Sequence, residues 1–380
     1  MNIAIIGAGP IGGYAGYLLA KAGHTVTLYE NHPQVGCPIQ CTGILTADFD
    51  EFLKESGLTM SSMDAYLVNV IDTVEVYTPK GQLAVKDKNY IVDRTRFDRF
   101  FVNLAVQEGA KLFVNHSFSG KNGLGIVIRD STGKVDKTIQ PDIIIGADGP
   151  LSPTAKAFGF YHPERINFYG VQATVEGNFE SHTIKTYFGT TVCPGLFAWI
   201  VPESATIARV GLATTKNSKH YFDQFMREHK FVAKEIQAGA IPIYHPQQKL
   251  QQGNCYLAGD AAGYVKATTL GGLVPGLQQA QILAKCINND IDNSGNKDKG
   301  IGKSYEQELA PVRRKMWLHW QLYKLFQKFS DEDWDRLVKY IENSGVTKVL
   351  EQHTRDNPWP IVVKALVKEP RLLGFLRYLW

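Results

Sequence analysis

Residues 1–30 read MNIAIIGAGPIGGYAGYLLAKAGHTVTLYE: an apolar run, a glycine-rich turn, a helix-type segment and a second apolar run ending in an acid. Residues 3–6 suit a buried parallel strand. Gly7 is expected to make the tight turn, Gly9 to let backbone approach a pyrophosphate, and Gly12 to let the helix close on the strand. The stretch therefore predicts a dinucleotide-binding unit whose helix N-terminus faces phosphates.

The acid that ends this unit narrows the choice of nucleotide. Glu30 follows the glycines by about 20 residues, where a carboxylate accepts hydrogen bonds from a ribose hydroxyl and repels the extra phosphate of NADP. An ordinary glycine-bearing turn is the alternative, but strand, helix and terminal acid together favour the nucleotide. The ligand expected from this unit is FAD or NAD.

Two further glycine-rich strand ends favour FAD. Residues 141–149 read PDIIIGADG, residues 255–263 read CYLAGDAAG, and GGLVPG follows at 271–276 before an apolar helix. Asp260 is placed to accept from a ribityl hydroxyl, and a helix opening near Gly272 is placed to face the flavin pyrimidine. NAD needs none of these features. The alternative is that both segments are plain turns, because Asp and Gly favour turns in general.

These motifs, with DRTRFD at 93–98, resemble the flavoprotein superfamily that includes para-hydroxybenzoate hydroxylase. Within it, the chain is most similar to the geranylgeranyl reductase family, including the archaeal digeranylgeranylglycerophospholipid reductases. VGCPIQCTGI at 35–44 resembles that family's loop after the second strand and keeps its Pro-x-x-Cys core. PGLFAWIVP at 194–202 resembles its Pro-x-x-Tyr-x-Trp-x-Phe-Pro signature, with Phe197 in place of Tyr and Val201 in place of Phe.

The resemblance covers roughly residues 1–290 and implies an α/β fold: a Rossmann-like FAD-binding domain of the glutathione reductase type, an antiparallel β-sheet substrate domain and a C-terminal helical segment. The expected boundaries are 1–60, 99–160 and 251–295 for the FAD-binding domain, 61–98 and 161–250 for the substrate domain, and 296–380 for the helical region. The candidate FAD-binding residues are Gly7, Gly9, Ile11, Gly12, Glu30, Cys41, Thr42, Gly43, Arg94, Phe118, Asp148, Gly149, Gly259, Asp260, Gly271, Gly272 and Leu273.

The candidate catalytic residues are Cys41, Phe197 and Trp199. Phe197 and Trp199 lie two apart on an expected strand, so their side chains share a face. Facing the flavin they would line an isoprenoid tunnel; facing away they would be core. Cys41 is a candidate to protonate the substrate or to tune the flavin, and a buried inert cysteine is the alternative. In either case hydride transfer would rest on the flavin.

Three functions compete. The first is reduction of geranylgeranyl double bonds in membrane ether lipids or prenyl diphosphates, with NAD(P)H or reduced ferredoxin as electron donor. The second is a flavin monooxygenase that hydroxylates an aromatic or quinone-type substrate. The third is an electron-transfer partner with an iron–sulfur cluster near its C-terminus, which is disfavoured because no cysteine follows Cys286. The Pro-x-x-Phe-x-Trp segment favours the reductase.

Whole-chain composition fits a cytoplasmic enzyme. The 380 residues carry a formal net charge of +4, too small by itself to indicate nucleic acid. The five cysteines are odd in number and scattered, which argues against a disulfide framework and for a reducing compartment. No signal peptide, membrane-spanning run or metal site is expected.

The C-terminal part has a basic and aromatic composition. Apolar side chains recur at helical spacing over residues 305–329, with lysines and arginines among them, and the tail at 364–380 reads KALVKEPRLLGFLRYLW. Such a segment either packs on its own protein or lies on a membrane surface. Self-packing is expected for 305–329, and peripheral membrane contact for the last dozen residues.

Overall fold

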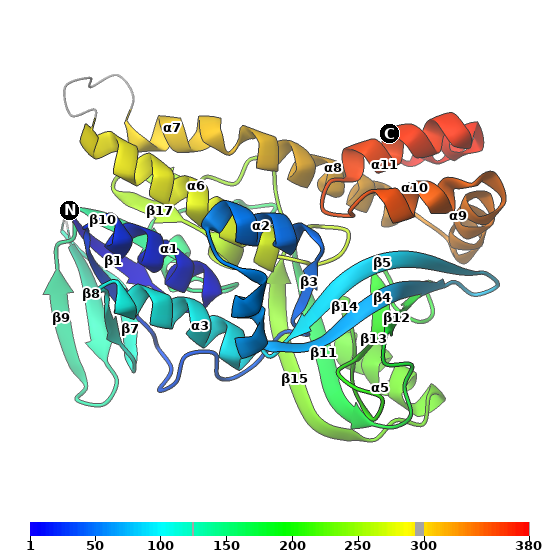
Figure 1. The fold of residues 1–380 in the computed structure, drawn as a ribbon, viewed down its shortest axis with the longest axis horizontal. Coiled ribbons are helices and arrows are strands. Elements are labelled where there is room, and N and C mark those ends of the chain that lie inside the picture. Colours follow the sequence, from blue (N-terminus) through cyan, green and yellow to red (C-terminus); the bar gives the residue numbers. More distant parts are fainter. Residues whose placement is uncertain (124, 293–299, 380) are drawn as a thin grey trace.

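The computed structural model describes residues 1–123, 125–292 and 300–379, and this part of the chain forms three β-sheets (Figure 1). The first sheet places β1 between β2 and β10, with both pairs parallel. Its central strands are apolar throughout because helices cover a parallel sheet. In spatial order its strands are β16 (Gln251–Gln252), β17 (Cys255–Leu257), β10 (Ile143–Gly146), β1 (Asn2–Ile6), β2 (Thr25–Tyr29) and β6 (Lys111–Phe113).

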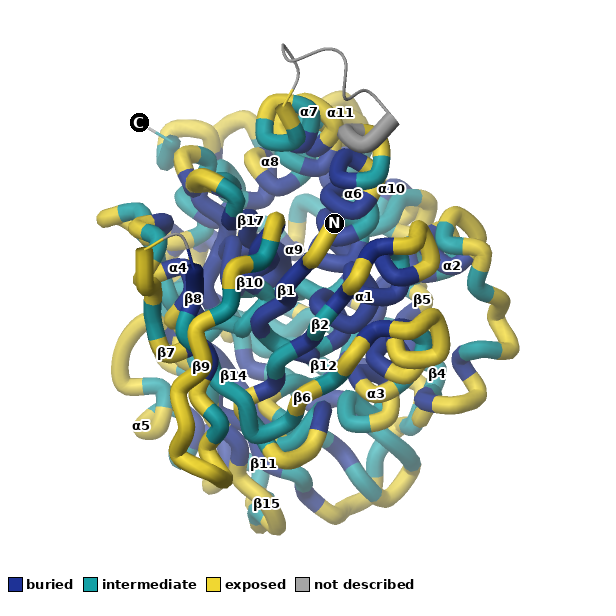
Figure 2. Tube along the Cα trace, turned by 90° about the vertical axis from the view of Figure 1, so that its left-hand side faces the viewer, coloured by how far each residue is buried: buried dark blue, intermediate teal, exposed yellow. Residues whose placement is uncertain are grey.

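Three of the described helices belong to the same half of the molecule as this sheet: α1 (Pro10–Lys21), α3 (Arg94–Gln107) and α6 (Leu273–Asp292). Helices α1 and α3 approach each other closely: a Cβ on Gly13 would lie 2.9 Å from Val102 Cγ2. Figure 2 shows β1 and α1 as mostly buried chain in the middle of the molecule. The second sheet is antiparallel and comprises β7 (His116–Asn122), β8 (Gly125–Asp130) and β9 (Val135–Ile139).

The sequence predicts one strand over residues 110–117, and this prediction is wrong in detail. The structure has β6 and then β7, with Asn115 between them at φ 58°. That left-handed backbone conformation, which Asn tolerates better than most residues, turns the chain out of the parallel sheet and into the antiparallel one.

The third sheet has eight strands and forms the other half of the molecule. It is antiparallel except that β12 and β4 run parallel. The sequence predicts strands at 73–77, 171–175, 183–187, 196–201 and 209–213, and the structure has a strand of this sheet at each of these places. In spatial order its strands are β15 (Ala233–Pro242), β11 (Asn167–Glu176), β14 (Ile207–Thr214), β13 (Phe197–Pro202), β12 (Thr183–Phe188), β4 (Leu67–Tyr77), β5 (Gln82–Val92) and β3 (Ile44–Thr46).

Before residue 300, five short helices of the described chain accompany the three sheets. One of them, α5 (Ser218–Glu228), packs on the third sheet through Phe222 and Phe225, which share a core with Val210. The other four are α2 (Asp48–Ser56), η1 (Met60–Ala65), α4 (Pro153–Ala157) and η2 (Gly259–Ala262).

The C-terminal region is helical; in Figure 1, α7 lies beside α6, and α9–α11 lie at the upper right, above the third sheet. Self-packing of 305–329 is confirmed, because Leu309, Val312, Met316 and Tyr323 are all buried. None of the described helices is both long and apolar enough to cross a bilayer. The elements are α7 (Ile301–Glu308), α8 (Ala310–Phe326), α9 (Asp331–Ser344), α10 (Val346–Gln352), α11 (Pro358–Lys368) and η3 (Pro370–Leu379).

Candidate flavin site

The glycine motifs converge at the carboxyl ends of the parallel strands. Gly7 has φ +97°, and a Cβ there would lie 2.4 Å from Ala147 O. A Cβ on Gly12 would lie 2.1 Å from Gly7 O, so the helix closes on the turn only with glycine at that position. Ile11 reaches the third motif, with its Cγ1 3.0 Å from the Cβ position of Gly259. Strands β1, β10 and β17 thus meet at one edge, where open α/β sheets bind ligands.

Space for a phosphate lies beside the first turn. Gly9 caps α1 without a side-chain hydrogen bond, and apart from its two chain neighbours no described residue has a heavy atom within 4 Å of its Cβ position. The same is true at Gly149, which has φ +79°. Open backbone amides at a helix N-terminus favour an anion, so this cradle fits the pyrophosphate that the sequence predicts.

Glu30 is held at the end of β2 by the turn itself. Its Oε2 accepts from Ala8 N–H (3.0 Å), and its Oε1 accepts from His32 N–H (3.0 Å) and contacts the His32 ring (2.7 Å). A carboxylate offers about four lone-pair positions, so capacity for a ribose hydroxyl remains. His32 was not predicted; its only signal in sequence is its position two residues after the acid.

Asp260 presents an enclosed carboxylate at the opening of α6. Burial raises its pKa, against the opposing charges of Arg94 and Arg165. No hydrogen bond reaches this carboxylate from the residues that the structure describes, and its Oδ1 lies 2.9 Å from the Cβ position of Gly272. The carboxylate is partly buried and its oxygens are free to accept, so the site fits a ribityl hydroxyl. Leu273 begins the helix, as expected.

Arg165 was missed by sequence reasoning and ties two motifs together. Its guanidinium donates to Pro150 O (3.1 Å), Asp260 O (3.0 Å) and Ala261 O (3.2 Å). Burial lowers its pKa. Because a planar guanidinium holds several carbonyls in fixed directions, Arg165 sets the spacing between the turns after β10 and β17.

Two candidate FAD-binding residues have structural partners of their own. The Asp148 carboxylate accepts from Ser152 Oγ and from Thr154 N–H (3.0 Å), which orders the start of α4. Phe118 is buried and packs against Phe158, with ring centroids 6.4 Å apart. A direct contact of either side chain with FAD stays a prediction.

The loop carrying Cys41 is fixed to the third sheet. Thr42 Oγ1 donates to Gln172 Oε1 on β11 (2.7 Å), and Gly43 N–H donates to Cys41 Sγ (3.4 Å). Gly43 has φ +77°, and a Cβ there would lie 2.3 Å from Val92 O. The loop is therefore tied to the third sheet by a side chain and by a close backbone approach.

Arg94 supplies a buried positive charge beside this loop. Its guanidinium makes two hydrogen bonds to the Asp98 carboxylate, at 2.9 and 3.1 Å. Burial opposes its charge, but Asp98 and the nearby Cys41 hold the pKa of Arg94 above its usual value. Arg94 thus stays charged within reach of the Cys41 loop.

Trp199 lies on the same sheet face as Gln172. Between them is Gly211, whose Cβ position is 2.8 Å from Trp199 Cζ2 and 2.6 Å from Gln172 Cβ. The Trp199 indole Nε1 is buried without a hydrogen-bond partner in the described part of the chain. Phe197 shares this face and contacts Trp199 edge-on, with centroids 6.2 Å apart. The structure thus brings the predicted aromatic pair to the face that holds Thr42; its contact with substrate stays a prediction.

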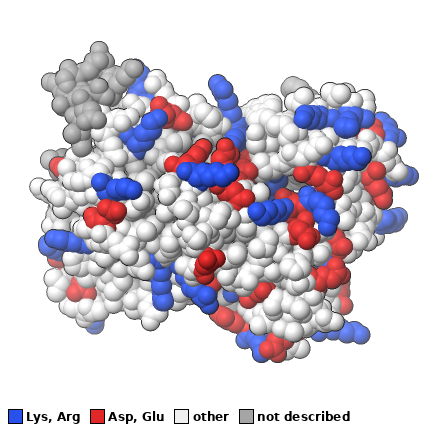
Figure 3. Space-filling model, viewed as in Figure 1, with Lys and Arg blue, Asp and Glu red and all other residues white. Residues whose placement is uncertain are grey.

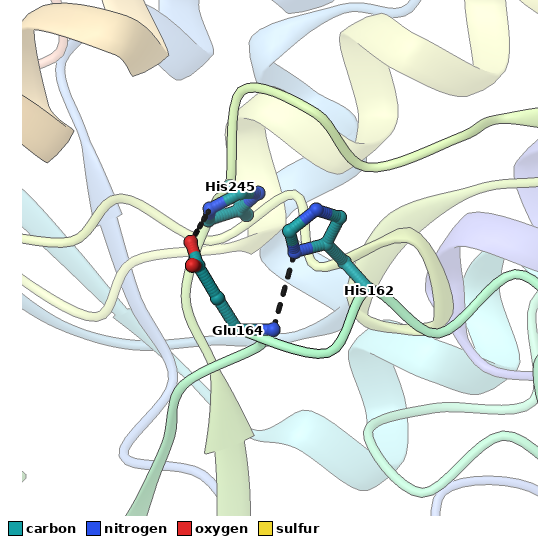
Figure 4. Close-up of side chains that lie close together, drawn as sticks. All are labelled: His162, Glu164 and His245. Atoms are coloured by element: carbon teal, nitrogen blue, oxygen red, sulfur yellow. Dashed lines mark hydrogen bonds and ion pairs between the residues drawn. The ribbon is translucent and has the colours of Figure 1, made fainter.

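A cluster of His162, Glu164 and His245 lies next to Arg165 (Figure 4). The two rings stack with centroids 4.2 Å apart. Each Nδ1 accepts a backbone N–H, from Glu164 (3.2 Å) and from Gln247 (3.3 Å), so the proton of each neutral ring sits on Nε2. Burial is the main cause that lowers the pKa of His245, and the neighbouring His162 is the second. Neither nitrogen of either ring offers a free lone pair, so the cluster orders this loop and is not arranged for a metal ion.

Comparison with known proteins agrees with this geometry. A Digeranylgeranylglycerophospholipid reductase 2 from Methanothermobacter thermautotrophicus is 26% identical over 379 residues, covering 92% of this chain and 93% of that protein. A Digeranylgeranylglycerophospholipid reductase from Methanococcus vannielii is 25% identical and covers 100% and 98%. A crystal structure of a geranylgeranyl bacteriochlorophyll reductase-like protein from Thermoplasma acidophilum superposes with TM-score 0.86 at 20% identity, covering 100% and 99%.

The flavin-dependent halogenase CmlS shares the fold, with TM-score 0.71 at 17% identity and coverage of 98% of this chain and 78% of that one. The family model described as "FAD binding domain" matches residues 1–318. That match includes every strand and turn of the site, so the resemblance drawn from the motifs is confirmed. The chain belongs to the FAD-binding-domain family of flavoproteins, and its cofactor is FAD.

Proposed function

We propose that this protein is an FAD-dependent reductase that saturates carbon–carbon double bonds in geranylgeranyl chains of membrane ether lipids or prenyl diphosphates. The observation that carries the proposal is the shared sheet face of Trp199 and Gln172, because Gln172 binds Thr42 beside Cys41. An apolar aromatic face next to the flavin loop suits a long hydrocarbon. The reductase names of relatives that match over nearly their whole length support the same substrate class.

The chemistry asks little of the protein beyond orientation and exclusion of water. When bound and reduced by two electrons, the flavin would supply a hydride to one alkene carbon. A proton must reach the other carbon, and Cys41 is the residue that we propose for delivering it or for tuning the flavin. The two electrons come from NAD(P)H or from a ferredoxin-like donor.

We also propose that the C-terminal region rests on the surface of an anionic membrane. Apolar side chains on α11 and η3 are exposed, with Val367 at 77% and Leu373 at 50%. Lys364, Lys368 and Arg371 lie among them in the sequence, and Figure 3 shows lysines and arginines over the C-terminal helices at the upper right. Apolar and basic side chains together are typical of interfacial segments.

An aromatic row supports a route from that surface to the flavin. Ring centroids are 5.2 Å apart for Phe197 and Phe188, 4.7 Å for Phe188 and Trp334, and 5.0 Å for Trp334 and Phe329. Phe329 in turn contacts Phe375 of η3 at 4.9 Å. A prenyl chain that followed this row from the tail toward Trp199 would contact the rings of Phe375, Phe329, Trp334, Phe188 and Phe197.

The test is anaerobic. The protein is reduced with dithionite and mixed with a geranylgeranyl lipid or diphosphate, and flavin reoxidation is followed together with product mass. Reoxidation with a mass gain in hydrogen pairs is expected. If the flavin stays reduced until air is admitted, the reductase proposal is wrong and the monooxygenase becomes the function to test with aromatic substrates.

A further inference from the structure

Lys266 and Asp356 form a buried ion pair between the flavin half and the C-terminal region. Only 4% of Lys266 and 8% of Asp356 is exposed, and Lys266 Nζ contacts Asp356 Oδ1. The other carboxylate oxygen of Asp356 accepts from Thr46 Oγ1 of β3 (2.8 Å). Breaking a buried pair of this kind leaves an uncompensated charge, so the two side chains hold each other in place.

The lysine belongs to the loop that opens α6. Lys266 N–H donates to Gly271 O (3.2 Å), and Leu270 N–H donates to Lys266 O (2.9 Å), which closes residues 266–271 on themselves. Leu270 has φ +54°, a conformation that a leucine adopts only when its surroundings impose it. The Cβ position of Gly271 lies 2.8 Å from Lys266 Cε, so the lysine stem packs directly on this glycine.

The same loop meets the flavin contacts described above. Gly272, the next residue, lies against Asp260, and Leu273 then begins α6. Lys266 and Asp260 therefore flank the two glycines from opposite sides. A displaced Lys266 would release Gly271 and shift the helix opening relative to the Asp260 carboxylate.

A second side chain from the C-terminal region holds the loop. Thr268 Oγ1 hydrogen-bonds His319 Nδ1 of α8 at 2.6 Å. Burial, followed by the charge of Lys266, lowers the pKa of His319 to about 3, so the ring is neutral and Nδ1 can accept the threonine hydroxyl. The two side chains that contact this loop, His319 of α8 and Asp356 of the turn before α11, thus both follow residue 300 in the sequence.

The turn that carries Asp356 is itself anchored. Arg355 pairs with Asp87 and donates to Asn89, both on β5. Residues 355 and 356 therefore contact the α6 loop, β3 and β5 at once, and β3 follows directly on the Cys41 loop. Because this turn is itself held by β3 and β5, its contact with Lys266 can fix the position of loop 266–271.

We propose that Asp356 is a positioning residue of the flavin site, which acts through Lys266 to hold loop 266–271 in the conformation that opens α6 toward FAD. The inference gives the C-terminal region a role in cofactor binding. It rests on FAD binding alone, so it can fail or hold independently of the geranylgeranyl substrate.

The test compares Asp356→Asn with Asp335→Asn. Asp335 also joins the C-terminal region to the main body, accepting from Thr78 Oγ1 (2.6 Å) and Lys80 N–H (2.8 Å), but on the β4–β5 hairpin. Apoprotein is titrated with FAD, and the dissociation constant is read from flavin fluorescence. We expect the constant of Asp356→Asn to rise about tenfold or more, and that of Asp335→Asn to stay within about twofold of the wild-type value.

A double variant, Lys266→Met with Asp356→Leu, separates the loss of the loop's position from the cost of leaving a buried charge unpaired. Replacing a buried pair with apolar side chains usually preserves stability, so this apoprotein should unfold near the wild-type temperature and also serves if Asp356→Asn fails to fold. Its FAD affinity should still be weakened about tenfold, because the ion pair no longer fixes the loop and only the Thr268–His319 hydrogen bond remains. Wild-type FAD affinity in the double variant, or equal affinities of Asp356→Asn and Asp335→Asn, would overturn the proposal.

Discussion

At the scale of single residues, Trp199 decides between pocket and core. Its indole Nε1 is buried without a partner in the described part of the chain, and its ring rests on Gly211. Trp199→Ala should lower turnover of geranylgeranyl substrates about tenfold or more while FAD stays bound, because the proposed function places the ring on the substrate face and not in the cofactor cradle. Steady-state rates and flavin content check this. Undiminished turnover would assign Trp199 to the core.

His319 should make the protein sensitive to mild acid. Its folded pKa of about 3 lies below the unfolded value of about 6.5, so the unfolded chain takes up a proton first as pH falls. This group therefore contributes full stability above about pH 6.5, and stability falls by up to about 1.4 kcal/mol per pH unit below it. His319→Gln removes that slope. Unfolding temperatures of both proteins from neutral pH to about pH 4.5 test this; parallel curves would contradict it.

The residues that sequence predicted are those whose role is local. Gly12 is required by its contact with Gly7 O within one strand–turn–helix unit, and Gly7 has φ +97° in the turn of that unit, so their spacing alone reveals them. Arg165, Gln172 and Lys266 act on segments that lie far away in sequence. No pattern marks an arginine that bonds carbonyls 95 positions on, and only the folded chain brings those partners together.

At the scale of elements, the C-terminal tail needs a finer test than truncation. Phe375 of η3 is buried against Phe329, so removing the tail would also expose core. Val363→Glu with Val367→Glu changes only exposed positions of α11. We expect this variant to keep its FAD and to bind anionic liposomes at least about fivefold more weakly, because it loses apolar contact and adds negative charge. Flotation equal to wild type would exclude α11 as the membrane contact.

Periodicity predicted most elements but not their boundaries. The strands of the third sheet follow alternating or apolar runs, so they could be located from composition. The split of residues 110–117 at Asn115 depends on one left-handed residue, which Asn permits but does not require. The parallel pairing of β12 with β4 joins segments about 110 positions apart and leaves no local signal.

At the scale of the whole molecule, the C-terminal region is part of the flavoprotein core and not an appendage. Tyr305, Leu309, Val312 and Met316 belong to the same buried cluster as β1 and α1, and Tyr305 Oη donates to Leu257 O at the end of β17 (3.2 Å). Sequence placed the end of the FAD-binding domain at about 295 because composition shifts there. Composition could not show that the new helices pack back onto the parallel sheet.

A chain ending at residue 300 should therefore fail to hold FAD. It would lose the buried side chains of Tyr305, Leu309, Val312 and Met316, and burying each such side chain stabilises the fold by about 1.5–3 kcal/mol. Their sum is comparable with the free energy of unfolding of a typical domain, about 5–15 kcal/mol. It would also lose the contacts of Lys266 and Thr268 with Asp356 and His319. A chain ending at residue 369 is the control: it lacks only η3 and should stay yellow, because those four side chains and both loop contacts remain. Flavin absorbance and sedimentation of the purified proteins decide the matter, and a monodisperse yellow protein ending at residue 300 would show that residues 1–300 form the flavin site by themselves.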